Sequence, residues 1–355
     1  MRSIRHAWRR PPGPIPQPRG RTTRILLLRY AAAGDLLQAA DLIRDLRAGL
    51  PAPEIYLACA PDLIPAAELL PGVRVLSLAN PYGPRASLLL SALKLRVYRA
   101  DIAISLHPGR RMALLGSLAT RGRSLDFSPG GLPWPQPAGG ELRQTFREAA
   151  RAIGVPPSIE GDLLRSPGLE AEERATRLIA QIPGGGPLVL IATGGGGASI
   201  SGFRRRWPPE HFGRLAGGLL DRGARVALVG LADDPAPPAF STGAADWRGS
   251  TTADELSLLV ERADLVITND SLPAVLSGLH GTRSIVLAGP TLAEQNRAGG
   301  DAATILRSDQ CSPCWLDAPP TEPCPHAQVC MTALPWEDVL EASLRALPTL
   351  ESLDT

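Results

Sequence analysis

The chain has 355 residues, of which 44% are hydrophobic and 20% are charged, and its formal net charge is +2. These values are ordinary for a globular protein, and the length suits two domains of roughly 150 residues each. No apolar run approaches the ~20 residues that cross a bilayer, and no secretory signal is visible, so we expect a bacterial-type cytoplasmic enzyme.

The small net charge hides an asymmetry along the chain. Residues 1–23 carry six arginines and no acidic residue, residues 24–155 carry 16 basic and 10 acidic residues, and residues 156–355 carry 15 basic and 25 acidic residues. A basic front half favours an anionic partner, either lipid headgroups or a phosphorylated acceptor, unless it is a chance surface bias. No recognised binding motif accompanies the charge, so nucleic acid is not expected as a partner.

The front half of the chain alternates between apolar runs and segments with helical spacing. Residues 1–22 are basic and proline-rich, which predicts a disordered tail. Strands are then expected at residues 24–28, 54–59, 73–78, 101–106 and 124–127, and helices at 36–48 and 85–99. The 85–99 helix, RASLLLSALKLRVYR, is predicted to be apolar on one side and basic on the other. Such a helix can lie on a membrane surface, although packing on its own sheet is the commoner cause.

The same alternation restarts in the back half. After a loop rich in proline and glycine at 130–140, a boundary is expected near 155–167. Helices are expected at 169–182, from Pro208 and at 334–347, and strands at 188–192, 225–230, 264–268 and 284–288. Two such alternations predict an α/β protein of two Rossmann-like, doubly wound domains facing a cleft, with residues 1–22 as a tail and domains at 23–160 and 161–355.

Residues 263–291 carry the densest local signal. An apolar strand ends in Asn269-Asp270-Ser271, Pro273 suits the first turn of a helix, and a second apolar strand follows. The polar turn therefore lies beyond the carboxyl end of a parallel strand, where such sheets bind ligands and where a helix N-terminus favours phosphate. The alternative is that Asp270 and Ser271 only cap the helix.

A glycine-rich turn follows the strand at 188–192. The run Thr193-Gly194-Gly195-Gly196-Gly197 matches neither a Walker loop nor G-x-G-x-x-G, but its backbone amides could cradle phosphate oxygens. Arg204-Arg205-Arg206 comes shortly afterwards, and three cations beside such a loop could hold a diphosphate leaving group. A flexible connector is the alternative interpretation.

Three acidic residues follow expected strands. Asp35 comes after the first strand, where a carboxylate could accept a proton from an acceptor hydroxyl, or where it could simply favour the start of a helix. Asp233 and Asp234 follow the 225–230 strand, where an acid can hold ribose hydroxyls or form a solvated turn. The sequence does not choose between these two carboxylates.

The cysteines suggest a metal site. Cys311, Cys314, Cys324 and Cys330 have the spacing C-x2-C-x9-C-x5-C, with His326 between the last two. The pattern resembles a structural zinc cluster, although the last two spacings are irregular, and the alternative is free buried thiols.

In their order along the chain, these segments resemble glycosyltransferase family 9, the lipopolysaccharide heptosyltransferases. The resemblance covers most of residues 24–345 and rests on ILLLRYAAAGDLLQAADLIRDLR, RRRWPPEHFGRLAGGLLDRGARVALVG, LVITNDSLPAVLSGLHGTRSIVLAGPT and the segment from Cys311 to Met331. It implies a GT-B fold and an inverting transfer of a sugar, usually heptose from ADP-heptose, to a lipopolysaccharide core without a catalytic metal. The partners so implied are an ADP-sugar, an anionic glycolipid acceptor bound by the N-terminal domain, and the inner face of the cytoplasmic membrane.

The resemblance also implies roles for individual residues. Asp35 matches the catalytic base, Arg205 a lysine that binds the donor diphosphate, and Asp233 or Asp234 the ribose-binding acid. The expected donor-binding residues are Thr193, Gly194, Gly195, Arg205, Asp233, Asp234, Asn269, Asp270, Ser271 and Leu272, and the expected acceptor-binding residues are Arg110 and Arg111.

Two departures put activity in question. The family's glycine falls at Leu272, and its histidine falls at Val275. His280 cannot replace that histidine, because five residues turn a helix by about 140° away from the same face. Alternative hypotheses are therefore a degenerate member that binds nucleotide or glycan without catalysis, or a transferase that modifies a protein.

Overall fold

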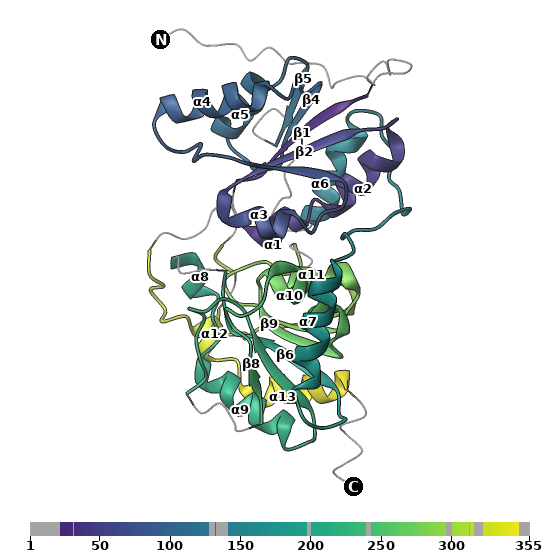
Figure 1. Cartoon of the computed structure of the whole chain (residues 1–355). Helices are drawn as coiled ribbons and strands as arrows, with labels where there is room; N and C mark the ends of the chain where they lie inside the picture. Colours follow the sequence, from purple (N-terminus) through teal and green to yellow (C-terminus); the bar gives the residue numbers. More distant parts are fainter. Residues whose placement is uncertain are drawn as a thin grey trace. The chain divides into compact units, whose positions relative to one another are not determined.

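The computed structural model describes residues 22–347, apart from 31, 128–131, 133–140, 197–199, 239–242, 296–299, 312 and 316–321. The expected tail, except residue 22, and most of the loop at 130–140 lie outside the described residues. The chain divides into two compact units, Met1–Arg165 and Ser166–Thr355, called unit 1 and unit 2 below (Figure 1).

Unit 1 is a five-stranded parallel sheet with helices on both faces. The strand order is β3-β2-β1-β4-β5, which is the order of a mononucleotide-binding half. Helices α4 and α5 pack together on one face and α2 and α6 on the other (Figure 1). The strands are β1 (Arg24–Leu28), β2 (Glu54–Cys59), β3 (Val73–Ser77), β4 (Ile102–Ser105) and β5 (Arg123–Asp126), and the α-helices are α1 (Ala33–Leu37), α2 (Ala40–Gly49), α3 (Ile64–Ala67), α4 (Arg85–Arg96), α5 (Arg110–Ala119) and α6 (Leu142–Arg151).

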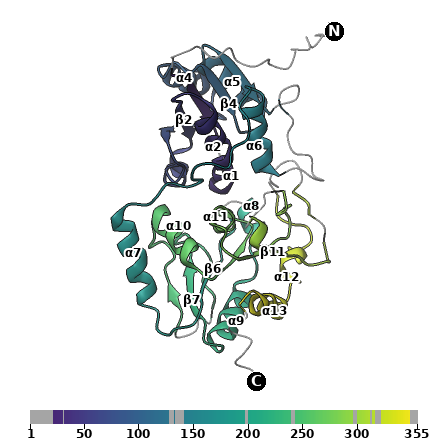
Figure 2. The ribbon, with the colours of Figure 1, turned by 90° about the vertical axis from the view of Figure 1, so that its right-hand side faces the viewer.

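Unit 2 repeats this architecture with six strands. Its order, β11-β10-β9-β6-β7-β8, is the Rossmann order 3-2-1-4-5-6 when its strands are counted within the unit. The strands are β6 (Leu188–Ala192), β7 (Arg225–Val229), β8 (Ala245–Asp246), β9 (Leu265–Asn269), β10 (Ser284–Leu287) and β11 (Ala303–Leu306). The α-helices are α7 (Leu169–Ala180), α8 (Ile200–Arg204), α9 (Pro209–Leu220), α10 (Ala253–Arg262), α11 (Leu272–His280), α12 (Val329–Thr332) and α13 (Trp336–Ala346). Helices α9 and α13 cover one face of this sheet and α7 and α10 cover the other (Figure 2).

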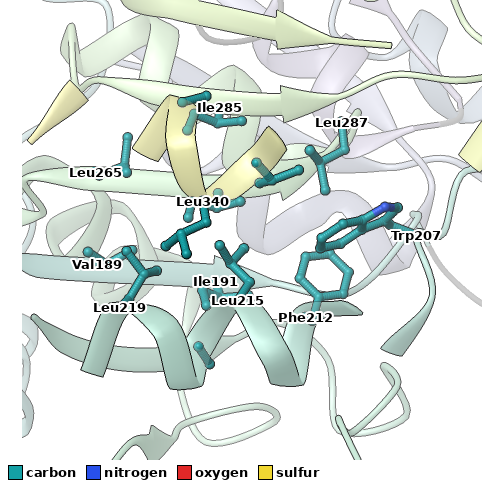
Figure 3. Packing of buried hydrophobic residues seen from close by; sticks show 14 of the residues in the cluster. Val189, Ile191, Trp207, Phe212, Leu215, Leu219, Leu265, Ile285, Leu287 and Leu340 are labelled. Carbon is teal, nitrogen blue, oxygen red and sulfur yellow. The ribbon is translucent and has the colours of Figure 1, made fainter. Parts of the chain in front are cut away.

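The core of unit 2 lies between its sheet and helices α9 and α13. Alternate residues of the strands, such as Val189 and Ile191 of β6, point towards Leu215 and Leu219 of α9 (Figure 3). Trp207 is fully buried at one end of this core, and its ring meets Phe212 edge to face with centroids 4.8 Å apart. Strands β6, β9 and β10 are short and entirely buried, so they appear in the sequence as continuous apolar runs.

The elements predicted from apolar runs are confirmed, with three corrections. The helix expected at 36–48 is two helices, α1 and α2, because Gln38 and Ala39 form a turn between them. Strands β8 and β11 were not expected, since one has two residues and the other is only partly buried. Finally, the exposed side of α4 is not purely basic: Leu89 and Leu93 are exposed on it together with its basic residues.

No described helix is both long enough and apolar enough to span a bilayer.

Candidate functional site

The carboxyl ends of β6 and β9 form the topological switch point of unit 2. These two strands are neighbours in the sheet, and the strands that follow each of them lie on opposite sides. Thr193 and Gly194 leave β6 at this point, and Asn269 and Asp270 leave β9 beside them. The structure therefore brings together the two turns that the sequence marked as phosphate-binding candidates.

Asn269 ties these turns to each other. Its side chain is fully buried, and its Nδ2 donates to the carbonyl oxygens of Thr193 (3.1 Å) and Gly194 (2.9 Å). Its Oδ1 accepts a hydrogen bond from the backbone N–H of Trp207 (3.0 Å). All of these hydrogen bonds join the Asn269 side-chain amide to backbone groups. The side chain therefore shapes the site and is not directed at a ligand.

The two adjacent acids behave differently. Asp234 is buried, accepts a hydrogen bond from the Leu231 N–H (2.8 Å) and lies 3.6 Å from the Arg206 guanidinium. Its carboxylate packs against Gly194 so closely that a Cβ on that glycine would collide with it. Burial raises the pKa of Asp234, and the hydrogen bond from the Leu231 N–H opposes this shift. Asp233 is exposed at the same turn, so it is the carboxylate that a ligand can reach.

The three consecutive arginines diverge, which corrects the expectation that they act together. Arg204 donates to the carbonyl oxygen of Glu322, and Arg206 faces the Asp234 carboxylate. Arg205 donates through Nη1 to the carbonyl oxygen of Asp270 (2.8 Å), at the turn after β9. Only this middle arginine is directed at the switch point.

The position of the Arg205 guanidinium is fixed from two further sides. It lies against Gly196, whose φ of +91° and close approach to the guanidinium leave no room for a side chain. It also lies over the ring of Trp315, 5.0 Å from the centroid. Trp315 is held in turn because its backbone N–H donates to the carbonyl oxygen of Pro290 (2.8 Å).

The cysteines do not form the expected zinc site. Among the described residues, which include Cys311, Cys314, Cys324 and Cys330, no three His, Cys, Asp or Glu side chains form a group that could hold a metal ion. Cys330 is buried in the core of unit 2, whereas Cys314 is exposed. Burial raises the pKa of the Cys330 thiol to about 11, and the neighbouring cysteines add to the shift. A buried, protonated thiol is the packing alternative that the sequence left open.

Helix α11 begins at the switch point without a side-chain cap. Ser271 is its N-cap residue, but the hydroxyl of Ser271 pairs with the hydroxyl of Thr268 (3.1 Å) and not with the helix backbone. The side chain of Ser271 therefore makes no capping hydrogen bond to α11. Val275 is buried in the helix, and His280 at the other end bonds to Ser257 of α10 (2.9 Å), so His280 does not supply the missing histidine.

Unit 1 has an analogous switch point between β1 and β4. Arg29 follows β1, is buried, and donates to the carbonyl oxygen of Leu106 after β4 (2.6 Å). The same guanidinium forms an ion pair with Asp35, whose side chain is 34% exposed. Burial lowers the pKa of Arg29 and the Asp35 charge opposes this shift. Asp35 is thus fixed at the carboxyl edge of the sheet with part of its carboxylate open to a ligand.

His107 lies at the same edge. Its ring is 5.8 Å from the ring of Tyr82, and its Nδ1 is buried without a hydrogen-bond partner among the described residues. Burial, helped by the charge of Arg29, lowers the pKa of His107 to about 4. Near pH 7 the imidazole is therefore neutral and can form hydrogen bonds to a ligand without carrying charge.

The two expected acceptor-binding arginines differ in their contacts. Arg111 donates to the carbonyl oxygens of Tyr82 (3.1 Å) and Gly83 (2.7 Å), so it holds the turn before α4. Arg110 is exposed at the start of α5.

Sequence reasoning missed three residues of these sites: Arg29, His107 and Trp315. Arg29 and His107 directly follow strand residues, so their place after a strand was a usable signal. Nothing near Trp315 in the sequence indicates that its ring lies over Arg205, since that contact depends on the docking of the Cys311–Trp315 segment at Pro290.

Two Rossmann-like units, each with polar groups at its switch point, are the architecture of the GT-B fold class. Solved structures agree in fold. The glycosyltransferase family 9 protein of Veillonella parvula has a TM-score of 0.72 at 18% identity, over 92% of this chain and 98% of that one. The ADP-heptose lipopolysaccharide heptosyltransferase II of Escherichia coli has a TM-score of 0.69 at 18% identity, over 93% and 100%.

The family is shown by sequence. The model of glycosyltransferase family 9 (heptosyltransferase) matches residues 145–323, so the chain belongs to this family. Lipooligosaccharide heptosyltransferase 2 of Haemophilus influenzae is 31% identical over 115 residues, which are 30% of this chain and about a third (33%) of that protein. The family match begins after β5, so Arg29, Asp35 and His107 lie outside it.

Proposed function

We propose that this protein is an inverting glycosyltransferase that moves a sugar, heptose from ADP-heptose, onto a lipopolysaccharide core or a related envelope glycan. The observation that carries the proposal is the position of Arg205 at the unit 2 switch point, beside the start of α11. A guanidinium and helix N–H groups at one sheet edge suit a diphosphate, because both stabilise negative charge. Family membership and the ADP-heptose of the similar E. coli enzyme support this choice of donor.

The proposed reaction is a single displacement at the anomeric carbon. Asp35 accepts the proton of the acceptor hydroxyl, the new carbon–oxygen bond forms, and the bond to the diphosphate breaks on the opposite face. Arg205 and the amide of Leu272 stabilise the charge that develops on the leaving group, and Asp233 binds the ribose. We propose that no metal ion is needed, because a fixed cation already faces the diphosphate.

The acceptor and the place of action follow from the same proposal. An anionic glycolipid suits Arg110 and Arg111 of unit 1, of which Arg110 is exposed and able to reach a ligand. Such an acceptor would be met at the inner face of the cytoplasmic membrane, with the protein bound peripherally.

The test uses the full chain with ADP-heptose and a delipidated core oligosaccharide. We expect Asp35→Asn to lower kcat at least 100-fold, since it removes the base, with ADP affinity within twofold of wild type, since Asp35 lies in unit 1 and the candidate donor site in unit 2. Arg205→Ala should weaken ADP binding about tenfold or more, as expected for loss of a charge-assisted hydrogen bond. Arg174→Ala, an exposed arginine on α7, is the matched control and should change neither quantity. Unchanged turnover in Asp35→Asn would remove the proposed base.

A second candidate is a family member that binds a nucleotide without transfer. The buried Val275, where the family keeps a histidine, favours it. ADP binding without turnover over a panel of sugar donors and acceptors would support this candidate. Transfer to a protein and not to a glycan would instead indicate a protein-modifying transferase.

A further inference from the structure

Helix α4 is apolar on both of its faces. Leu88, Ala92 and Leu95 are buried against the sheet of unit 1. The opposite side exposes four large apolar residues: Leu89 (53%), Leu90 (59%), Leu93 (54%) and Val97 (70%). A helix that packs one face on its own sheet ordinarily presents polar residues to water, so the outer face of α4 is suited to a further contact.

The exposed residues of α4 are ordered around its axis. At about 100° per residue, Leu89, Leu93, Val97 and Leu90 occupy a sector from roughly 40° to 140°, measured from Arg85. Arg85 and Arg96 fall at roughly 0° to 20°, and Lys94 at roughly 180°. The apolar stripe thus has cations along both sides, which is the pattern of helices that lie in the interface of a bilayer.

The residues around α4 are also apolar and basic. Helix α5 packs beside α4 and exposes Leu114 (48%), and Arg96 donates to the carbonyl oxygen of Leu118 (2.8 Å), which joins the two helices. Residues 80–123 contain eight basic residues and a single acidic one, Asp101. That carboxylate accepts a hydrogen bond from the Arg24 backbone N–H at the start of the sheet (2.9 Å), and the basic residues of this stretch outnumber it.

We propose that α4, together with Leu114, is the surface by which the protein lies on an anionic phospholipid bilayer. The leucines enter the boundary between headgroups and acyl chains, and Arg85, Lys94 and Arg96 contact the phosphates. Twelve residues of helix, about 18 Å long, provide this contact. The inference deepens the proposed function, because it places the protein where a lipid-anchored acceptor is found.

Charge distinguishes a bilayer from a second copy of the chain. Two copies joined through α4 would bring cations against cations, because Arg85, Lys94 and Arg96 border the stripe on both sides. An anionic lipid surface satisfies the apolar residues and the cations at once.

The experiment measures sedimentation of the full chain with vesicles of phosphatidylcholine alone or mixed with phosphatidylglycerol. We expect at least tenfold tighter binding to the anionic vesicles, weakened by salt. Leu89→Gln with Leu93→Gln should weaken that binding at least tenfold. Arg85→Gln with Lys94→Gln should weaken it about 25-fold, at about fivefold per cation. Ile159→Gln with Leu169→Gln, which changes two exposed apolar residues away from α4, should bind as wild type does.

Several results would overturn the inference. These are absence of wild-type binding to anionic vesicles, wild-type binding by the Leu89/Leu93 variant, or a wild-type dimer that this variant dissociates. ADP affinity and transfer to the delipidated acceptor do not involve α4, so both should be unchanged in every variant. Absence of vesicle binding by the wild type with intact transfer would therefore refute the membrane surface and leave the proposed function standing. Vesicle binding by the wild type without any transfer would do the opposite.

Discussion

Single buried polar side chains organise both sheet edges. Arg29 links the carboxyl ends of β1 and β4 through the Leu106 carbonyl, and Asn269 links those of β6 and β9 through Thr193 and Gly194. The Arg29 hydrogen bond spans the switch point of unit 1, and the Asn269 hydrogen bonds span the switch point of unit 2. Each unit thus uses a buried donor to fix the groups that face a ligand.

His107 gives the unit 1 edge a pH dependence. Its pKa is lowered to about 4 in the folded protein, against about 6.5 when unfolded. Between these values the unfolded chain binds more protons, so stability is full above about pH 6.5 and falls as pH is lowered towards 4. The loss is up to about 3 kcal/mol at the low end.

Urea unfolding at pH 7 and pH 4.5 measures this effect. We expect the difference in unfolding free energy between the two pH values to shrink by about 2 kcal/mol in His107→Gln. The exposed His326, which lies in a surface turn, is the matched control, and His326→Gln should leave the difference unchanged. An equal pH dependence in wild type and His107→Gln would contradict a buried neutral imidazole.

At the scale of elements, the unit 2 site is a junction of four segments. The turns after β6 and β9, the stretch between α8 and α9 that carries Arg205, and the segment at Trp315 meet around one guanidinium. None of these segments alone is a recognised nucleotide motif. Their combination forms the site, and Asn269, at the end of β9, bonds to the turn after β6 and to Trp207 in the stretch before α9.

Asn269→Ala tests this junction. The change leaves two buried carbonyl oxygens and the Trp207 N–H without partners, at about 1–3 kcal/mol for each buried group. We expect the unfolding free energy to fall by at least 2 kcal/mol and ADP affinity to fall at least tenfold, although Asn269 does not face the ligand.

Asn269→Asp distinguishes the loss of the Asn269 hydrogen bonds from the effect of the cavity that alanine leaves. The aspartate keeps the acceptor for Trp207 but places a carboxylate against the carbonyls of Thr193 and Gly194. It should therefore be at least as damaging as alanine in chemical unfolding and in ADP titration. Full retention of ADP affinity in both variants would show that the junction does not depend on this side chain.

At the scale of the molecule, each unit has its own sheet and its own buried core. Ion pairs add to the unit 1 core: Arg147 of α6 contacts Asp45 of α2 (2.7 Å), and both side chains are almost fully buried. The candidate donor site lies wholly in unit 2, and the Arg29–Asp35 pair lies wholly in unit 1. Donor binding should therefore stabilise one unit directly.

Scanning calorimetry of the full chain with ADP tests this division. At about 100 times its Kd, ADP adds about 2.7 kcal/mol to the unit it binds, which raises that transition by about 5 to 10 °C. The unit 2 transition should shift, and Arg205→Ala, with ADP bound about tenfold more weakly, should remove about half of the shift at the same ADP concentration.

Assignment of the transitions needs a marker. Asp45→Ala leaves Arg147 buried without its carboxylate, so it should lower the unit 1 transition alone. If ADP shifted the same transition that Asp45→Ala lowers, the nucleotide would bind unit 1. That result would contradict a donor site in unit 2.

The sequence by itself determined the α/β class, the strands apart from β8 and β11, and the family. Buried parallel strands such as β6 and β9 are continuous apolar runs, and this signal is local to each run. The polar turns after them were also readable, because their position follows from the end of a strand. That is why Asp35, Arg205 and the Asn269 turn could be singled out without a structure.

Only the tertiary structure decided what each polar residue does. It separated Asp233 from Asp234 by burial, gave Arg204 and Arg206 partners other than the turn that Arg205 contacts, and showed that the outer face of α4 carries large apolar residues. It also showed that the described cysteines form no group that could hold a metal ion, and it brought Trp315 to Arg205. These outcomes depend on contacts between segments up to about a hundred residues apart. The spacing of residues along the chain does not predict such contacts.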